Sequence, residues 1–254
     1  MQLITSKDNE KVKHIRKLKD KKYREQTGQY IIEGIKLLDE AIKEKVNLDT
    51  IVICEDKLIN TNVDKKILYE IARYNCIYVN QNIFNLLTEV TNPQGILGIA
   101  NKNNEETKIN YEDDIIVVLD NIQDPGNLGT IIRTVDSIGL KQLIVSKNSC
   151  DAYSPKVVRS TMGALFRVKL VESENLVETL LEIKKHKFKI MATSLETKES
   201  IYSTKFFKKV IIIGNEANGI SKEILEIADE KIKIPMLRKN RKLKCISCNR
   251  NYII

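Results

Sequence analysis

Runs of aliphatic, mostly β-branched residues alternate with amphipathic segments along the second half of the chain. Past residue 113 the apolar runs are continuous, and the segments between them carry apolar residues at helical spacing. Continuous apolar strands separated by helices predict an α/β fold with a mostly parallel sheet that is covered on both faces. Strands are expected at 115–119, 143–145, 188–192, 210–213 and 231–234, and helices at 128–138, 154–163, 176–186 and 222–228.

The first hundred residues predict a separate, smaller α/β domain. Its strands are expected at 30–33, 50–54, 77–79 and 96–100, and its helices at 34–44, 65–73 and 81–87. Residues 101–108 are polar and lack periodicity, which is typical of a linker. We therefore predict a domain over 1–100, a linker over 101–112 and a second domain over 113–254.

A basic segment precedes the first predicted strand. Between Lys7 and Arg24 the chain has nine Lys or Arg and three acidic residues, and Val12, Ile15 and Leu18 recur at helical spacing. This pattern predicts a docked helix whose other faces are basic. A solvated helix face would explain part of it, but so many cations favour a face that contacts phosphates.

The cysteines and the net charge indicate the compartment of the protein and the kind of partner it binds. The cysteines form an odd, scattered set, which indicates reduced thiols rather than a disulfide framework: Cys54, Cys76, Cys150, Cys245 and Cys248. No apolar run is long enough for a membrane span, and the first residues do not resemble a signal peptide, so we expect a cytoplasmic protein. The net charge of +8 indicates a polyanionic partner.

Polar turns with candidate chemistry follow two of the predicted strands. After 115–119, Pro125 and Gly126 shape a turn, Asn127 can cap the next helix, and Arg133 lies nearly two helical turns further on. After 210–213 comes a Gly-rich turn over 214–221 that places Glu216 at the edge of the sheet. Ligands bind at the carboxyl ends of such strands. A structural turn and cap is the alternative interpretation.

Neither turn has the spacing of a dinucleotide-binding or P-loop motif, so hydrolysis of nucleoside triphosphates is not expected. Both resemble motifs of a known family. Residues 119–134 (LDNIQDPGNLGTIIRT) resemble the first motif of the SpoU (TrmH) RNA 2′-O-ribose methyltransferases of the SPOUT superfamily, and 213–220 (IGNEANGI) resemble the second. Residues 234–236 (IPM) resemble the opening of the third motif, and 156–164 (KVVRSTMGA) the stretch between the first two.

The resemblance implies a trefoil-knotted α/β domain, usually a homodimer, that binds S-adenosylmethionine in the knot. A ribose 2′-hydroxyl is a poor nucleophile, so it needs positioning and help with proton removal. The matching positions imply that Arg133 assists deprotonation near a flanking phosphate, with Asn127 and Glu216 beside it. They also imply a cofactor pocket formed by Thr193, Gly214, Ile234, Met236 and Leu243.

The amino-terminal half is similar to the substrate-binding domain that many of these enzymes carry, which has the fold of a ribosomal protein. The similarity lies in Thr5-Ser6, the basic helix and Ile32-Glu33-Gly34. It implies an RNA substrate, ribosomal RNA rather than transfer RNA. Candidate RNA-contacting residues are Lys7, Lys11, Lys13, Arg16, Lys17, Arg24, Lys156 and Arg159.

The carboxy-terminal tail departs from the family pattern. The third motif should continue through Glu-Ser-Leu-Asn, but the Ser and Asn positions hold Lys242 and Lys244, and only Leu243 is in place. Synonymous codons for residues 238–250 can be chosen that, read one nucleotide later, encode Gly-Lys-Thr-Glu-Ser-Leu-Asn-Val-Ser-Val-Ala-Thr-Gly. We therefore interpret 238–254 as an out-of-frame sequence that impairs catalysis and leaves the knot incomplete. A non-catalytic RNA-binding relative is the alternative.

This interpretation changes two other inferences. Residues 238–254 contain six Lys or Arg and no acidic residue, whereas the shifted frame has one Lys and one Glu, so the net charge would fall from +8 to about +2. Cys245 and Cys248 are half of a zinc site without a second pair, so no metal is expected. His14 and His186 are expected on the surface.

The coding DNA tests the frame hypothesis. We expect the codons from Arg238 onward to encode Glu-Ser-Leu-Asn in the next frame, because one slipped nucleotide near Leu237 explains the whole tail. Sequencing the gene from independently prepared genomic DNA measures this. Codons that fail to give the motif in the shifted frame would contradict the hypothesis.

Overall fold

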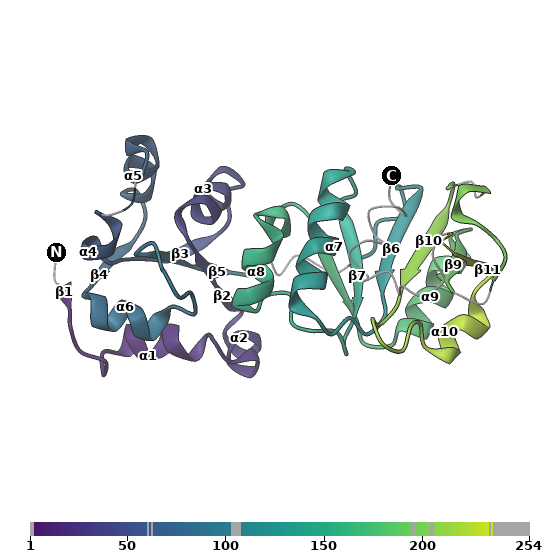
Figure 1. Cartoon of the computed structure of the whole chain (residues 1–254), viewed down its shortest axis with the longest axis horizontal. Coiled ribbons are helices and arrows are strands. Elements are labelled where there is room, and N and C mark those ends of the chain that lie inside the picture. The colour runs from purple at the N-terminus through teal and green to yellow at the C-terminus, as the bar shows by residue number, and fades with distance from the viewer. Residues whose placement is uncertain are drawn as a thin grey trace. The chain divides into compact units, whose positions relative to one another are not determined.

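The computed structural model describes residues 3–59, 61, 63–102, 108–194, 197–203, 206–233 and 235. It divides into two compact units (Figure 1). Among the described residues, unit 1 comprises those up to 102 together with 151–166, and unit 2 comprises 108–150 and 167–235. No described helix is both long and apolar enough to cross a membrane.

Unit 1 is built on a mixed five-stranded sheet. The strand order is β1 (Leu3–Ile4), β4 (Cys76–Val79), β3 (Leu48–Ile53), β5 (Ile96–Asn101) and β2 (Gln29–Glu33). The first three are parallel, whereas β5 runs antiparallel to both of its neighbours. Its amino-terminal helices are α1 (Glu10–Lys17), α2 (Lys21–Thr27), α3 (Ile35–Lys43), α4 (Glu55–Leu58), α5 (Lys65–Ile71) and α6 (Gln81–Leu87).

The sheet of unit 1 separates two hydrophobic cores. Val12 and Ile15 of α1 pack with Phe84 of α6 on one face, and Leu38 of α3 packs with Ile71 of α5 on the other. Figure 1 shows α1 and α6 together on one side of this sheet, with α3 and α5 on the opposite side. The apolar spacing read from the sequence therefore marks the buried faces of these helices.

The basic segment does not form the single helix that the sequence predicts. Helix α1 ends at Lys17, and α2 begins at Lys21 after Asp20, whose carboxylate accepts a hydrogen bond from the Tyr23 amide at 3.0 Å. An aspartate in extended conformation that caps a free amide starts a new helix. The break turns the side chain of Arg24 inward, where only 3% of the residue is exposed.

Residues 151–166 belong to unit 1, although they lie between two strands of unit 2 in the sequence. They contain α8 (Pro155–Thr161), which packs on β2. Tyr153 packs on Tyr30 with ring centroids 5.0 Å apart, and burial raises the pKa of the Tyr30 hydroxyl. The compact units therefore differ at this segment from the division at residue 113 expected from the sequence.

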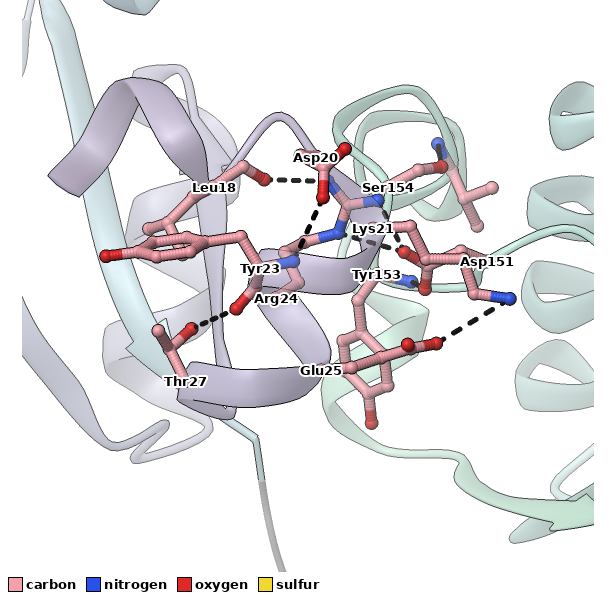
Figure 2. Close-up of polar contacts among 11 residues, drawn as sticks. Leu18, Asp20, Lys21, Tyr23, Arg24, Glu25, Thr27, Asp151, Tyr153 and Ser154 are labelled. Carbon is pink, nitrogen blue, oxygen red and sulfur yellow. Dashed lines mark hydrogen bonds and ion pairs between the residues drawn. The ribbon is translucent and has the colours of Figure 1, made fainter. Parts of the chain in front are cut away.

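Arg24 is the main polar link between α2 and this segment (Figure 2). Its guanidinium donates to Asp151 Oδ2 at 2.9 and 2.6 Å, and to the Leu18 carbonyl at 2.7 Å. Beside it, Arg159 approaches Glu33 Oε2 at 3.5 Å, and Glu33 is buried and also accepts from Thr88. Buried charges are tolerated when they are paired and hydrogen-bonded, and Arg24 meets that condition.

Unit 2 is a six-stranded, fully parallel sheet. Its order is β11 (Glu230–Ile232), β9 (Lys189–Thr193), β10 (Lys209–Ile213), β6 (Ile115–Leu119), β7 (Gln142–Ser146) and β8 (Lys169–Ser173). The helices are α7 (Pro125–Ser137), α9 (Leu176–Lys185) and α10 (Lys222–Ile227), with short 3-10 turns at Ala164–Phe166, which belongs to unit 1, and Ile201–Ser203. The mostly parallel α/β fold expected from the sequence is confirmed.

One strand of unit 2 was missed by the sequence analysis. Strand β8 lies at the edge of the sheet, and its residues alternate between exposed and buried rather than forming a continuous apolar run. The interior strands β6, β7 and β10 have that run, because both of their faces are covered. The apolar pattern therefore predicts the interior strands and the edge strand β11, but not β8 at the other edge.

The ion pair of Arg24 predicts a large effect on the stability of unit 1. Asp151→Ala leaves a buried guanidinium without its carboxylate, and breaking such a pair costs about 3–5 kcal/mol of the free energy of unfolding. Urea denaturation followed by hydrogen-exchange mass spectrometry of peptides from α2 and α8 reports unit 1 separately.

The matched control is Asp39→Ala, which removes a carboxylate that pairs with the exposed Lys43 at 2.6 Å. Exposed pairs of this kind contribute less than about 1 kcal/mol. Equal losses of stability in the two variants would contradict a structural role for the buried pair.

Candidate functional site

The loops that follow β10 and β6 are joined at the carboxyl edge of the parallel sheet. The Ser221 amide donates to Asp120 Oδ2 at 2.7 Å, and Asn215 Nδ2 donates to the Asn121 carbonyl at 2.8 Å. Because β6 and β10 are neighbouring parallel strands in register, their carboxyl ends meet. Two sequence motifs about ninety residues apart therefore form one surface.

The loop after β7 supports this surface from the other side. Ser146 Oγ accepts from the Asn121 amide at 2.8 Å, and Ser149 Oγ accepts from the Ile122 amide at 3.1 Å. Asn121 has a left-handed backbone with φ of 60°. A non-glycine residue in this region persists where its surroundings hold it, as these hydrogen bonds do.

Helix α7 begins at this edge and carries the first motif. Asp124, rather than Asn127, is its capping residue, because the Asp124 carboxylate accepts from the Asn127 amide at 2.7 Å. The Asn127 side chain is left to reach across the site, where its Nδ2 donates to Glu216 Oε1 at 2.7 Å. Asn127 is buried with 8% of its surface exposed, and Glu216 is half-buried. The structure thus brings these two predicted residues into contact.

The other predicted residues of unit 2 that the structure describes lie at the same edge or on the same helix. Thr193 is half-buried at the end of β9, next to β10, and Arg133 is exposed on α7. Ile234, Met236 and Leu243 lie outside the described residues, as does the tail with Cys245 and Cys248. Within the described ranges no group of His, Cys, Asp or Glu is arranged to hold a metal ion.

Gly214 marks the closest backbone approach of the site. The Gly214 φ does not require glycine, but a Cβ atom there would lie 2.3 Å from the Gly219 carbonyl carbon and 2.4 Å from the Ile220 nitrogen. Asn215 and Gly219 exchange two backbone hydrogen bonds of 2.9 Å, which close the turn tightly. Asn215 Oδ1 also accepts from the amides of Ala217 and Asn218. Only glycine fits this position, because the returning backbone occupies the space of a side chain.

The arrangement suits positioning rather than nucleophilic or metal chemistry. The carboxylate of Glu216 fixes the Asn127 amide so that its Oδ1 can accept a further hydrogen bond, and Arg133 supplies a permanent positive charge on the same helix. Asp120, Ser146 and Asn215 hold the loops in place and were not predicted. Their positions immediately after predicted strands are the sequence signal that could have identified them.

The candidate RNA-contacting cations of unit 1 fall into three groups. Four of the amino-terminal residues are exposed, as is a residue on α8: Lys7, Lys11, Arg16, Lys17 and Lys156. Lys13 and Arg159 are half-buried and pair with Glu10 and Glu33. The prediction for Arg24 is wrong, because its guanidinium is buried and bonded to Asp151.

Comparison with known proteins identifies relatives for both parts of the chain. Residues 114–243 match the SpoU rRNA Methylase family, and residues 9–98 match the MRM3-like substrate binding domain. The Bacillus subtilis 23S rRNA (guanosine(2553)-2′-O)-methyltransferase RlmP is 30% identical over 239 residues, which is 93% of this chain and 91% of that protein. The mitochondrial rRNA methyltransferase 3 of Xenopus tropicalis is 35% identical over 165 residues, or 61% of this chain and 38% of that protein.

Solved structures share the fold over nearly the full length. The AdoMet-bound rRNA methyltransferase from Sinorhizobium meliloti superposes with a TM-score of 0.85 at 27% identity, covering 99% of this chain and 95% of that one. A putative RNA methyltransferase of the TrmH family from Porphyromonas gingivalis gives a TM-score of 0.82 at 25% identity, covering 97% of this chain and 96% of that one.

The close approach at Gly214 predicts the effect of a minimal substitution. Gly214→Ala forces the turn over 214–221 apart, which should cost about 1–3 kcal/mol of stability, as overpacking does. Hydrogen-exchange mass spectrometry should show faster exchange of the amides of Asn215 and Gly219. Ala217→Ser, at an exposed position of the same turn, is the control and should leave exchange unchanged; a Gly214→Ala variant with native exchange rates would refute the packing argument.

Proposed function

Because the chain belongs to the SpoU rRNA Methylase family, we propose that it transfers a methyl group from S-adenosylmethionine to a ribose 2′-hydroxyl of structured RNA. We propose ribosomal RNA as the substrate. The observation that carries the proposal is the contact between Asn127 and Glu216 at the carboxyl edge of the sheet, with Arg133 on the same helix as Asn127. RlmP and the Sinorhizobium meliloti enzyme, which both align over more than nine-tenths of this chain, are named as rRNA methyltransferases, and this supports that substrate class.

Small ligands of parallel α/β sheets bind at the carboxyl ends of the strands, where the two motif loops meet. The space beside Gly214 is filled by the backbone of Gly219 and Ile220, so the role of Gly214 is to let this turn close tightly after β10. Thr193 ends β9, Gly214 directly follows the neighbouring strand β10, and both would border the cofactor. When bound, S-adenosylmethionine supplies an electrophilic methyl group on a sulfonium.

The residues of the chain supply the remaining requirements of the reaction. An arginine stays protonated in proteins, so Arg133 cannot accept the hydroxyl proton. Its charge can instead hold a flanking phosphate and favour the developing alkoxide, which makes removal of the proton by solvent easier. Asn127, fixed by Glu216, can accept a hydrogen bond and orient the ribose.

The tail bears on the activity of this chain. The family match ends at residue 243, and the Ser and Asn positions expected from the third motif hold Lys242 and Lys244. We propose that the chain as written is impaired, and that a frame-restored chain is an active homodimer. A non-catalytic RNA-binding protein is the second candidate, and the substituted third motif is the observation that favours it.

Methyl incorporation into ribosomal RNA tests the catalytic roles. In a frame-restored chain, Arg133→Ala should lower single-turnover methyl transfer by about 10²–10⁴-fold, as loss of help with proton transfer does. Binding of S-adenosylmethionine, measured by calorimetry, should change little. Arg73→Ala removes an exposed arginine of unit 1 and should leave the rate unchanged.

Two outcomes of the same assay would contradict these proposals. A frame-restored chain that binds no S-adenosylmethionine would refute the proposed function. Equal turnover of the restored chain and the chain as written would refute the proposed impairment. Light scattering of both chains measures whether the restored tail is needed for the dimer.

A further inference from the structure

Unit 1 has a concavity between α1 and its sheet that the proposed reaction does not use. Its volume is about 360 Å³, within the range of roughly 300–1,000 Å³ typical of small-ligand sites. Ile15 of α1 and Ile99 of β5 line it, and both are at least 98% buried. The cavity therefore has an apolar floor, and Lys11 is the one residue of its lining that was predicted to contact RNA.

One wall of this cavity is a chain of hydrogen bonds that ends on a carboxylate. Asn75 Nδ2 donates to Thr50 Oγ1 at 3.1 Å, and the Thr50 hydroxyl donates to Asp49 Oδ2 at 2.8 Å. Asp49 lies at an irregularity of the pairing between β3 and β5, where the register shifts between Leu48 and Thr50. Such bulges re-aim a side chain, and they are frequent at binding sites.

The Asp49 carboxylate is available to a ligand. Thr50 is 7% exposed, whereas Asp49 and Asn75 are exposed at the opening. In the described part of the chain Asp49 forms no salt bridge, and its bond to Thr50 occupies only one of its oxygens. Asn75 uses one amide hydrogen on Thr50, so its second hydrogen and its carbonyl oxygen are available too.

The opposite wall contains a flat side chain that is fixed in orientation. His14 Nε2 bonds to Gln29 Oε1 at 2.7 Å, and His14 Nδ1 bonds to the Tyr23 hydroxyl at 2.9 Å. Gln29 in turn donates to Asn101 Oδ1 at 2.9 Å, which sets the orientation of its amide. Contrary to the expectation of a surface histidine, the imidazole is half-buried and held at both nitrogens.

We propose that this cavity binds one unstacked guanine base of the RNA substrate. Single-stranded RNA is recognised by stacking a base on a flat side chain and bonding its edge, and here His14 supplies the flat surface. A carboxylate is best matched by two adjacent N–H donors, and guanine presents them at N1 and N2. The free Asn75 amide hydrogen matches guanine O6, and the exposed Lys11 matches a neighbouring phosphate.

The same edge disfavours the other bases. Adenine would place the lone pair of its N1 against the Asp49 carboxylate, and uracil would place two carbonyl oxygens beside it. The negative charge of Glu10, which also lines the cavity, is compensated by Lys13, whose ammonium lies 2.9 Å from the Glu10 carboxylate. Glu10 therefore does not repel a phosphate that binds beside Lys11. The proposal rests on the proposed function only in taking RNA as the partner, and it requires no bound methyl donor.

Binding of short labelled oligouridylates that carry one central guanosine, adenosine or cytidine tests this directly. Fluorescence anisotropy with the full chain, at low salt and without S-adenosylmethionine, should show about tenfold tighter binding of the guanosine oligomer. Asp49→Asn, which keeps the shape of the side chain, should abolish that preference. Asn75→Ala should weaken it, and Glu70→Gln, which removes a comparable exposed charge on α5, should retain it.

Equal affinity for all three oligomers, or a preference that survives Asp49→Asn, would overturn the proposal. Circular dichroism of each variant separates lost binding from lost folding, and Asn75→Ala gives a second measurement if Asp49→Asn unfolds. Failure of methyl transfer in a frame-restored chain that keeps the guanosine preference would count against the proposed function alone. A chain that methylates RNA without the preference would count against this site alone.

Discussion

The candidate site depends on the parallel alignment of β10, β6 and β7. Parallel strands in register end at one edge, so every loop that leaves that edge starts beside its neighbours. Backbone amides then do much of the joining, as the bond from Ser221 to Asp120 shows. Because the loops start side by side, polar side chains on one loop can contact those on the next. The hydrogen bond from Asn127 to Glu216 is an example.

Unit 1 is held by a different kind of interaction. Its two cores lie on opposite faces of a mixed sheet, and residues 151–166 are fastened to it by buried ion pairs rather than by strand pairing. The guanidinium of Arg24 donates hydrogen bonds to the Asp151 carboxylate and the Leu18 carbonyl at the same time, which restricts its position. Removal of one partner of such a pair is costly, because the other charge is left buried without compensation.

Much of the fold could be predicted because interior strands and helix faces leave periodic apolar patterns. Strands β6 and β10 were found in this way, and their flanking turns gave Asn127, Gly214 and Glu216. The edge strand β8 has a weaker pattern, and the break before α2 depends on a single aspartate cap. Sequence patterns also overestimate exposure, since a lysine-rich segment does not reveal that Arg24 turns inward.

Other parts of the structure depend on contacts that no local pattern encodes. The cavity beside Asp49 requires a shift of strand register and a histidine fixed from β2, and both arise only from tertiary packing. The placement of α8 is of the same kind, because its own sequence predicts a helix but not the sheet on which it packs.

The placement of residues 151–166 sets an order for folding during synthesis. A ribosome that has completed β5 has made all five strands of unit 1, but Arg24 still lacks Asp151 and Glu33 still lacks Arg159. Those partners emerge only after β6, α7 and β7 have been made. Unit 1 therefore completes its packing only after part of unit 2 has been synthesised, because these two ion pairs cannot form earlier.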